Sequence, residues 1–147
     1  MQSPTSSEVI SFAVKLEEDS GNFYEELALR GANDRETWTS FSAQNRKNKT
    51  AIQRAYYGVI SDALEGCFAF AEIDTDNYPI NTELPLELGY AESLRRAIEI
   101  EDMITAFYLD AARAAKSLLA DVPIVFERTA RKRNERQLEL KKLLNAL

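Results

Sequence analysis

The chain has no histidine and a single cysteine, Cys67, among its 147 residues. The absence of histidine excludes the Ser-His-Asp and Cys-His arrangements of hydrolases and removes the commonest nitrogen ligand for metals. One cysteine cannot form an intrachain disulfide, so a reducing compartment is the simpler expectation.

The sequence predicts neither a membrane span nor a leader segment. No run is apolar enough to span a bilayer, and the first 30 residues lack a basic stretch followed by an apolar core. We therefore expect a cytoplasmic protein with no membrane partner. A net charge of −6 disfavours generic nucleic-acid binding, so no nucleic-acid partner is expected either.

Apolar residues recur with a period of about 3.6 along most of the chain, which is typical of amphipathic helices. The first helix opens at the capping-box spacing of Thr5 and Glu8, and Asn33 and Glu36 have the same spacing before the second. We expect helices that end or begin near the following residues: Thr5 to Arg30, Asn33 to Leu64, Tyr90 to Leu119, and Ile124 to the C-terminus.

The stretch from 65 to 89 has no sustained period and contains Pro79 and Pro85. We expect it to lie against the bundle because it contains the apolar residues Phe68, Phe70, Ile80, Leu84, Leu86 and Leu88. A connection of this length between the second and third helices can cross from one end of a bundle to the other. We therefore predict a single all-α domain over residues 1–147. It would be an antiparallel four-helix bundle with one long crossover, the ferritin-like arrangement.

Two segments of the chain repeat at a constant offset of 84 residues. The first begins at Ala13, carries Glu17 and continues to Phe23-Tyr24. The second begins at Ala97, carries Glu101 and continues to Phe107-Tyr108. Each copy places a glutamate on the apolar stripe, two helical turns before a tyrosine. This pattern predicts two helical hairpins related by internal duplication.

Polar residues interrupt each of the four apolar stripes near mid-length. They are Glu17, Asn45 and Asn48, Glu101, and Arg133 and Arg136, with Tyr24 and Tyr108 adjacent. Carboxylates, guanidiniums and amides can satisfy one another in an apolar surrounding, whereas an unpaired buried charge is costly. We predict an interior polar layer across the core. The plainer alternative is that both glutamates lie at the stripe edge and reach solvent.

The duplicated pattern is Ala-Val-x-x-Glu in the first copy and Ala-Ile-x-x-Glu in the second, each followed by Phe-Tyr. It resembles the rubrerythrin-like branch of the ferritin-like superfamily. The resemblance extends from about Ser7 to Leu144. In that family the two glutamates are ligands of a di-iron site, and the second and fourth helices each add a Glu-x-x-His motif. The resemblance therefore implies that Glu17 and Glu101 are vestigial metal ligands.

The family's other ligands are missing from this chain. Aligned from Phe41, their positions fall on Asn48 and Ala51; aligned from Phe126, they fall on Arg133 and Arg136. We therefore expect no catalytic residues and no cofactor, with Arg133 supplying the positive charge that metals supply in relatives.

Three functions stay open at this point. The first is a non-catalytic structural or interaction module. The second is an iron oxidoreductase of peroxidase or ferroxidase type with an atypical site, and the third is a small-ligand carrier that uses the bundle interior. Trp38, Tyr56-Tyr57 and the apolar residues of the connection are more than one small bundle needs, which favours a homodimer. The seven basic residues of the last helix are interpreted as a solvated face.

Overall fold

The computed structural model describes residues 5–30, 34–59, 73–115 and 121–147. Within these ranges the chain is all-α, and no strand occurs among them. The elements are four long helices, α1 (Ser6–Leu29), α2 (Arg35–Val59), α3 (Tyr90–Ala115) and α4 (Val122–Asn145), and a 3₁₀ turn at Thr75–Asn77.

The capping box predicted at the start of the first helix is confirmed. The backbone N–H of Glu8 donates to Thr5 Oγ1 at 3.1 Å, and the backbone N–H of Thr5 donates to Glu8 Oε1 at 3.2 Å. The second predicted box includes Asn33, which lies outside the described residues, as do the expected ends of the second and third helices at Leu64 and Leu119. Helix α4 starts two residues earlier than expected, since Pro123 fits its first turn.

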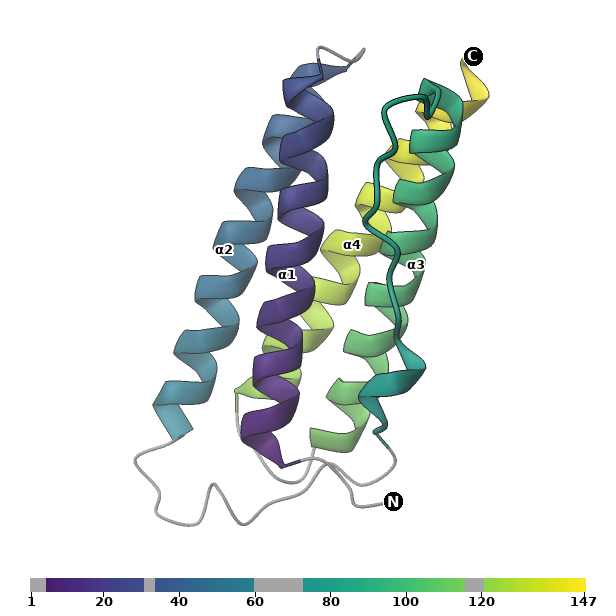
Figure 1. Cartoon of the computed structure of the whole chain (residues 1–147). Coiled ribbons are helices and arrows are strands. Elements are labelled where there is room, and N and C mark those ends of the chain that lie inside the picture. The colour runs from purple at the N-terminus through teal and green to yellow at the C-terminus, as the bar shows by residue number, and fades with distance from the viewer. Residues whose placement is uncertain (1–4, 31–33, 60–72, 116–120) are drawn as a thin grey trace.

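The four helices lie side by side, and neighbours along the chain are antiparallel within each pair, α1 with α2 and α3 with α4 (Figure 1). Helices α1 and α4 run in one direction, and α2 and α3 run in the other. This arrangement requires the chain to return along the length of the molecule between α2 and α3. The described part of that return, residues 73–89, runs beside α3.

This connecting segment is fastened to the helices at both ends. The Tyr78 hydroxyl donates to Asp110 at 2.5 Å, and its ring meets Phe107 edge-on at 5.3 Å. At the other end, the Arg30 guanidinium donates to the carbonyl oxygens of Leu84 and Pro85. The segment therefore covers the seam between α1 and α3.

The expectation that the apolar residues of the connection lie against the bundle is wrong for Leu86. It is 89% exposed, because it sits in the turn closed by the hydrogen bond from Leu88 N–H to Pro85 C=O. Cys67, Phe68 and Phe70 fall outside the described residues.

The aromatic residues that suggested a homodimer are largely used within one chain. Trp38 is fully buried. Its ring stacks on that of Tyr24, with 5.7 Å between the ring centroids, and meets that of Phe41 edge-on, with 6.0 Å between the centroids. Tyr56 is 7% exposed, whereas Tyr57 is 59% exposed. Packing between the helices of one bundle accounts for the first two, whereas Tyr57 and Leu86 of the connection stay exposed. The homodimer stays a prediction.

Candidate functional site

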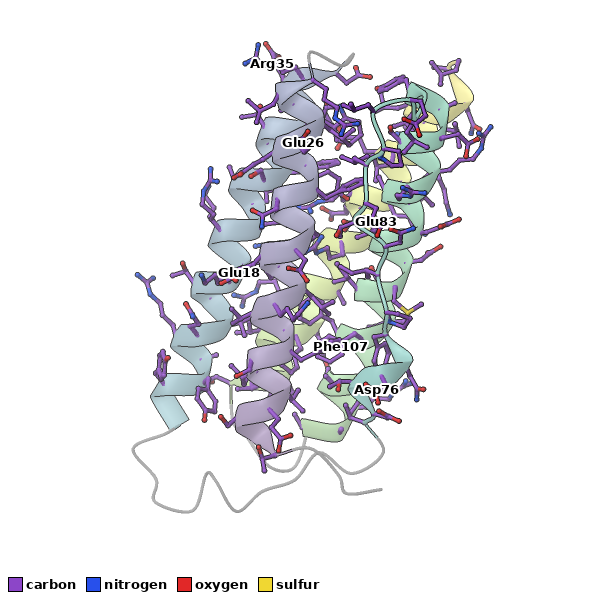
Figure 2. All side chains as sticks on the ribbon, viewed as in Figure 1. Glu18, Glu26, Arg35, Asp76, Glu83 and Phe107 are labelled. Atoms are coloured by element: carbon purple, nitrogen blue, oxygen red, sulfur yellow. The ribbon has the colours of Figure 1, made fainter. Side chains whose placement is uncertain are left out.

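Arg133 of α4 lies at the centre of the molecule with its side chain 0% exposed. Its Nη2 is 2.7 Å from Glu17 Oε2, and its Nη1 is 2.7 Å from Glu101 Oε2. One guanidinium therefore bridges the carboxylates of α1 and α3. Side chains fill the space between the four ribbons (Figure 2).

Each glutamate also accepts a hydrogen bond from a tyrosine of the other hairpin. The Tyr24 hydroxyl of α1 donates to Glu101 Oε2 at 2.5 Å, and the Tyr108 hydroxyl of α3 donates to Glu17 Oε2 at 2.5 Å. The two bonds are equivalent under the 84-residue offset of the sequence. Together with Arg133, they connect the two hairpins across the core.

Helix α2 contributes amides rather than charges. Asn48 Nδ2 donates to Glu17 Oε1 at 3.3 Å. Asn45 Nδ2 donates to Ser20 Oγ at 2.7 Å and to the Glu17 backbone carbonyl at 3.0 Å. Ser20 Oγ in turn accepts from Arg133 Nη2 at 3.1 Å. These bonds connect α2 to α1 and, through Ser20, to α4.

The second guanidinium, Arg136, lies beside the first and faces α2. Its Nη1 donates to Asn45 Oδ1 at 2.6 Å and lies 3.6 Å from Glu101 Oε2. Its Nη2 donates to Gln44 Oε1 at 2.9 Å, and its guanidinium carbon sits 4.6 Å from the centre of the Phe41 ring. An arginine over an aromatic face gains cation–π attraction as well as hydrogen bonds.

Helical periodicity explains why these groups meet. Glu17, Ser20 and Tyr24 are spaced by three and four residues, so they share one face of α1. Arg133 and Arg136 are related in the same way on α4. Gly21 faces α2, and a Cβ there would lie 3.5 Å from the Asn45 side chain, which is an ordinary contact distance.

Burial and charge set the ionisation of the layer. Burial first, and then the charge of Glu101, raises the pKa of Tyr24 well above its ordinary value. Burial and the charge of Glu17 do the same to the pKa of Tyr108. Burial works against the charged form of Arg133, but Glu101 and Glu17 outweigh it and raise its pKa. The tyrosines stay neutral donors, and the arginine stays a cation.

The structure brings together the six predicted residues of the layer and the two adjacent tyrosines. Each of these eight residues is at most 2% exposed. The structure also adds Ser20 and Gln44, which the sequence reasoning did not single out. Ser20 lies on the inward stripe three residues after Glu17, and that spacing was the available signal. No sequence signal pointed to Gln44, because its hydrogen bond with Arg136 depends on how closely α2 approaches α4.

The donor set does not fit the di-iron centre that the family resemblance implies. The chain has no histidine, and the positions that the resemblance assigns to the other ligands hold Asn48, Ala51, Arg133 and Arg136. The Arg133 guanidinium occupies hydrogen-bonding distance from both glutamates, and a cation there repels a metal ion. Within the described ranges, no three His, Cys, Asp or Glu residues are grouped so that they could hold a metal.

Comparison with models of known protein families, with curated proteins and with solved structures finds no match to this chain. None of the helices in the described ranges combines the length and apolar character needed to cross a membrane.

Proposed function

We propose that this chain is a ferritin-like, rubrerythrin-like four-helix bundle that has lost its di-iron site and acts as a non-catalytic structural or interaction module. The observation that carries the proposal is the position of Arg133, which binds both Glu17 and Glu101 at 2.7 Å. In this account the guanidinium supplies the positive charge that the two metals supply in relatives.

The reciprocal tyrosine bonds support an origin by internal duplication. Tyr24 with Glu101 and Tyr108 with Glu17 are the same pair of contacts with the two hairpins exchanged. An ancestral pair of identical hairpins would form both. The direction of the helices, with α1 and α4 opposed to α2 and α3, is that expected for a ferritin-like crossover.

Such a layer contributes specificity more than stability. Removing two carboxylates and two guanidiniums from water costs free energy that their attraction does not always return. Their directional bonds nevertheless allow one register of four helices. A rigid bundle of this kind presents fixed outer surfaces, and we propose that these surfaces, in a homodimer or with another protein, are where it acts.

Metal analysis of protein produced in iron-replete medium tests the loss of the di-iron site. We expect far less than one iron per chain and no peroxidase activity. The Glu17→Ala/Glu101→Ala variant should have the same iron content and the same lack of activity. Stoichiometric iron that disappears in this variant would overturn the proposal and favour an oxidoreductase with an atypical site.

A further inference from the structure

A groove of about 360 Å³ follows the seam between α2 and α4. It is lined by Phe41, Gln44, Lys47, Asn48, Lys132, Glu135, Arg136 and Glu139. Its volume is within the range of about 300–1,000 Å³ that small-molecule sites occupy. Its walls belong to the two helices that supply the amides and guanidiniums of the polar layer.

The floor of the groove carries polar groups that are almost completely buried. Asn48 and Arg136 are each 2% exposed, and both line the groove. Arg136 Nε has no hydrogen-bond partner among the described residues. A buried donor without a partner costs free energy, so an acceptor that enters the groove and meets this donor would be bound favourably.

Two lysines stand at the rim. Lys47 comes from α2 and Lys132 from α4, both are exposed, and both line the groove. Neither forms an ion pair within the parts of the chain that the structure describes. Glu135 and Glu139 also line it, so that its four exposed charges cancel by formal count, while the fifth, on Arg136, is buried and shared with the polar layer.

The groove also lies on the basic side of the molecule. Helices α2 and α4 together carry 12 Lys or Arg and 4 Asp or Glu. Helices α1 and α3 with residues 73–89 carry 4 basic and 15 acidic residues. Glu18, Glu26, Asp76 and Glu83 mark that acidic side in Figure 2. A cleft on a positive face concentrates anions and speeds their encounter.

The geometry points to a binding site for a small organic monocarboxylate in this groove, with its carboxylate held by Lys47, Lys132 and the Arg136 side chain. Lys47 and Lys132 offer one carboxylate a cation from each helix, and the two glutamates in the lining disfavour a ligand with further negative charges. The Phe41 ring and the aliphatic stems of the lysines offer an apolar wall for the body of the acid. The proposed site would be present whether or not the bundle binds a di-iron centre.

Calorimetric titration with benzoate at low ionic strength tests the site, with benzamide as the uncharged analogue. We expect saturable one-to-one binding of benzoate and binding of benzamide weaker by about tenfold or more, because a charged hydrogen bond is lost. Absence of saturable benzoate binding, or equal binding of benzamide, would overturn the proposal.

Paired variants on α4 locate the binding. Lys132→Gln should weaken benzoate binding several-fold, and Glu135→Gln should strengthen it. Lys141→Gln and Glu127→Gln make the same changes of charge on exposed positions outside the groove and should change the dissociation constant by less than about twofold. Equal effects of Lys132→Gln and Lys141→Gln would mean general attraction to a basic surface and would contradict a site in the groove.

Discussion

The four charged side chains of the polar layer, Glu17, Glu101, Arg133 and Arg136, have a formal charge of zero between them. Each is at most 2% exposed, so no charge in the layer is screened by bulk water. Removing one partner of such a set strands the others and is far more costly than removing a neutral pair. Charge balance is therefore the residue-scale requirement that any variant of this core must meet.

The two tyrosines predict a fall in stability at alkaline pH. The pKa of Tyr24 and of Tyr108 is raised in the folded state by burial and by the neighbouring carboxylates, whereas in the unfolded chain it returns to about 10. Above that pH the folded protein holds more protons than the unfolded chain, so the free energy of unfolding falls as pH rises. Below pH 10 the two tyrosines make their full contribution to the free energy of unfolding.

Urea unfolding between pH 8 and pH 11 measures this effect. The Tyr24→Phe/Tyr108→Phe variant should be less stable at pH 8 by about 1.5–3 kcal/mol for each hydrogen bond to a carboxylate. It should also lose less stability than the parent between pH 8 and pH 11. Parallel curves for the two proteins would show that these tyrosines do not control the alkaline limb.

At the scale of the helix, the side of α1 that faces α2 carries a residue that is unfavourable within a helix. Gly21 lies inside α1, where glycine costs roughly 1 kcal/mol relative to alanine. A Cβ at this position would touch Asn45 at 3.5 Å, an ordinary contact distance. The neighbouring helix therefore leaves room for one methyl group.

We predict that Gly21→Ala raises the free energy of unfolding by up to about 1 kcal/mol. Gly21→Leu should lower it, because the larger side chain would push Asn45 from its bonds to Ser20 and Glu17. Thermal unfolding of both variants beside the parent measures the difference. A destabilising Gly21→Ala change would mean that α1 and α2 are closer than the structure places them.

Helical periodicity predicted most of this core because it depends on one helix at a time. The positions of Glu17, Asn48, Glu101 and Arg133 on their inward faces follow from counting residues along each stripe. That count could not identify the partner of each tyrosine. Each partner is a glutamate of the opposite hairpin, and that pairing depends on the distance between α1 and α3.

The same reason explains the misplaced expectations. Leu86 reads as part of an apolar connection, yet a turn directs it to solvent. Trp38 reads as surplus surface, yet it fills the space between the rings of Tyr24, Phe41 and Tyr90. Both outcomes are set by tertiary neighbours that the local pattern does not contain. The contact of Gln44 with Arg136 likewise depends on a tertiary neighbour, which is why the sequence did not single it out.

At the scale of the whole molecule, charge is divided between two sides. The chain has a net charge of −6, but α2 and α4 together are strongly basic while α1, α3 and residues 73–89 are acidic. Long-range electrostatic attraction depends on such a distribution as well as on the net charge. Ordinary ion exchange can detect it.

We predict that the protein is retained by a cation-exchange resin at pH 7 and low salt, despite a sequence pI of about 4.8. Lys47→Glu on α2 should reduce this retention clearly. Lys15→Glu on the acidic helix α1 changes the net charge equally and should reduce it much less. Failure of the parent protein to bind, or equal effects of the two variants, would contradict a basic face.

The central claim, that Arg133 neutralises two buried carboxylates, is tested most directly by urea unfolding of Arg133→Met and Arg133→Met/Glu17→Gln beside the parent. The single variant leaves the layer with a charge of −1 and should lose about 3–5 kcal/mol. The double variant restores zero charge, leaves Glu101 with Arg136 at 3.6 Å, and should recover part of that loss. A single variant as stable as the parent, or a double variant less stable than the single, would contradict the account.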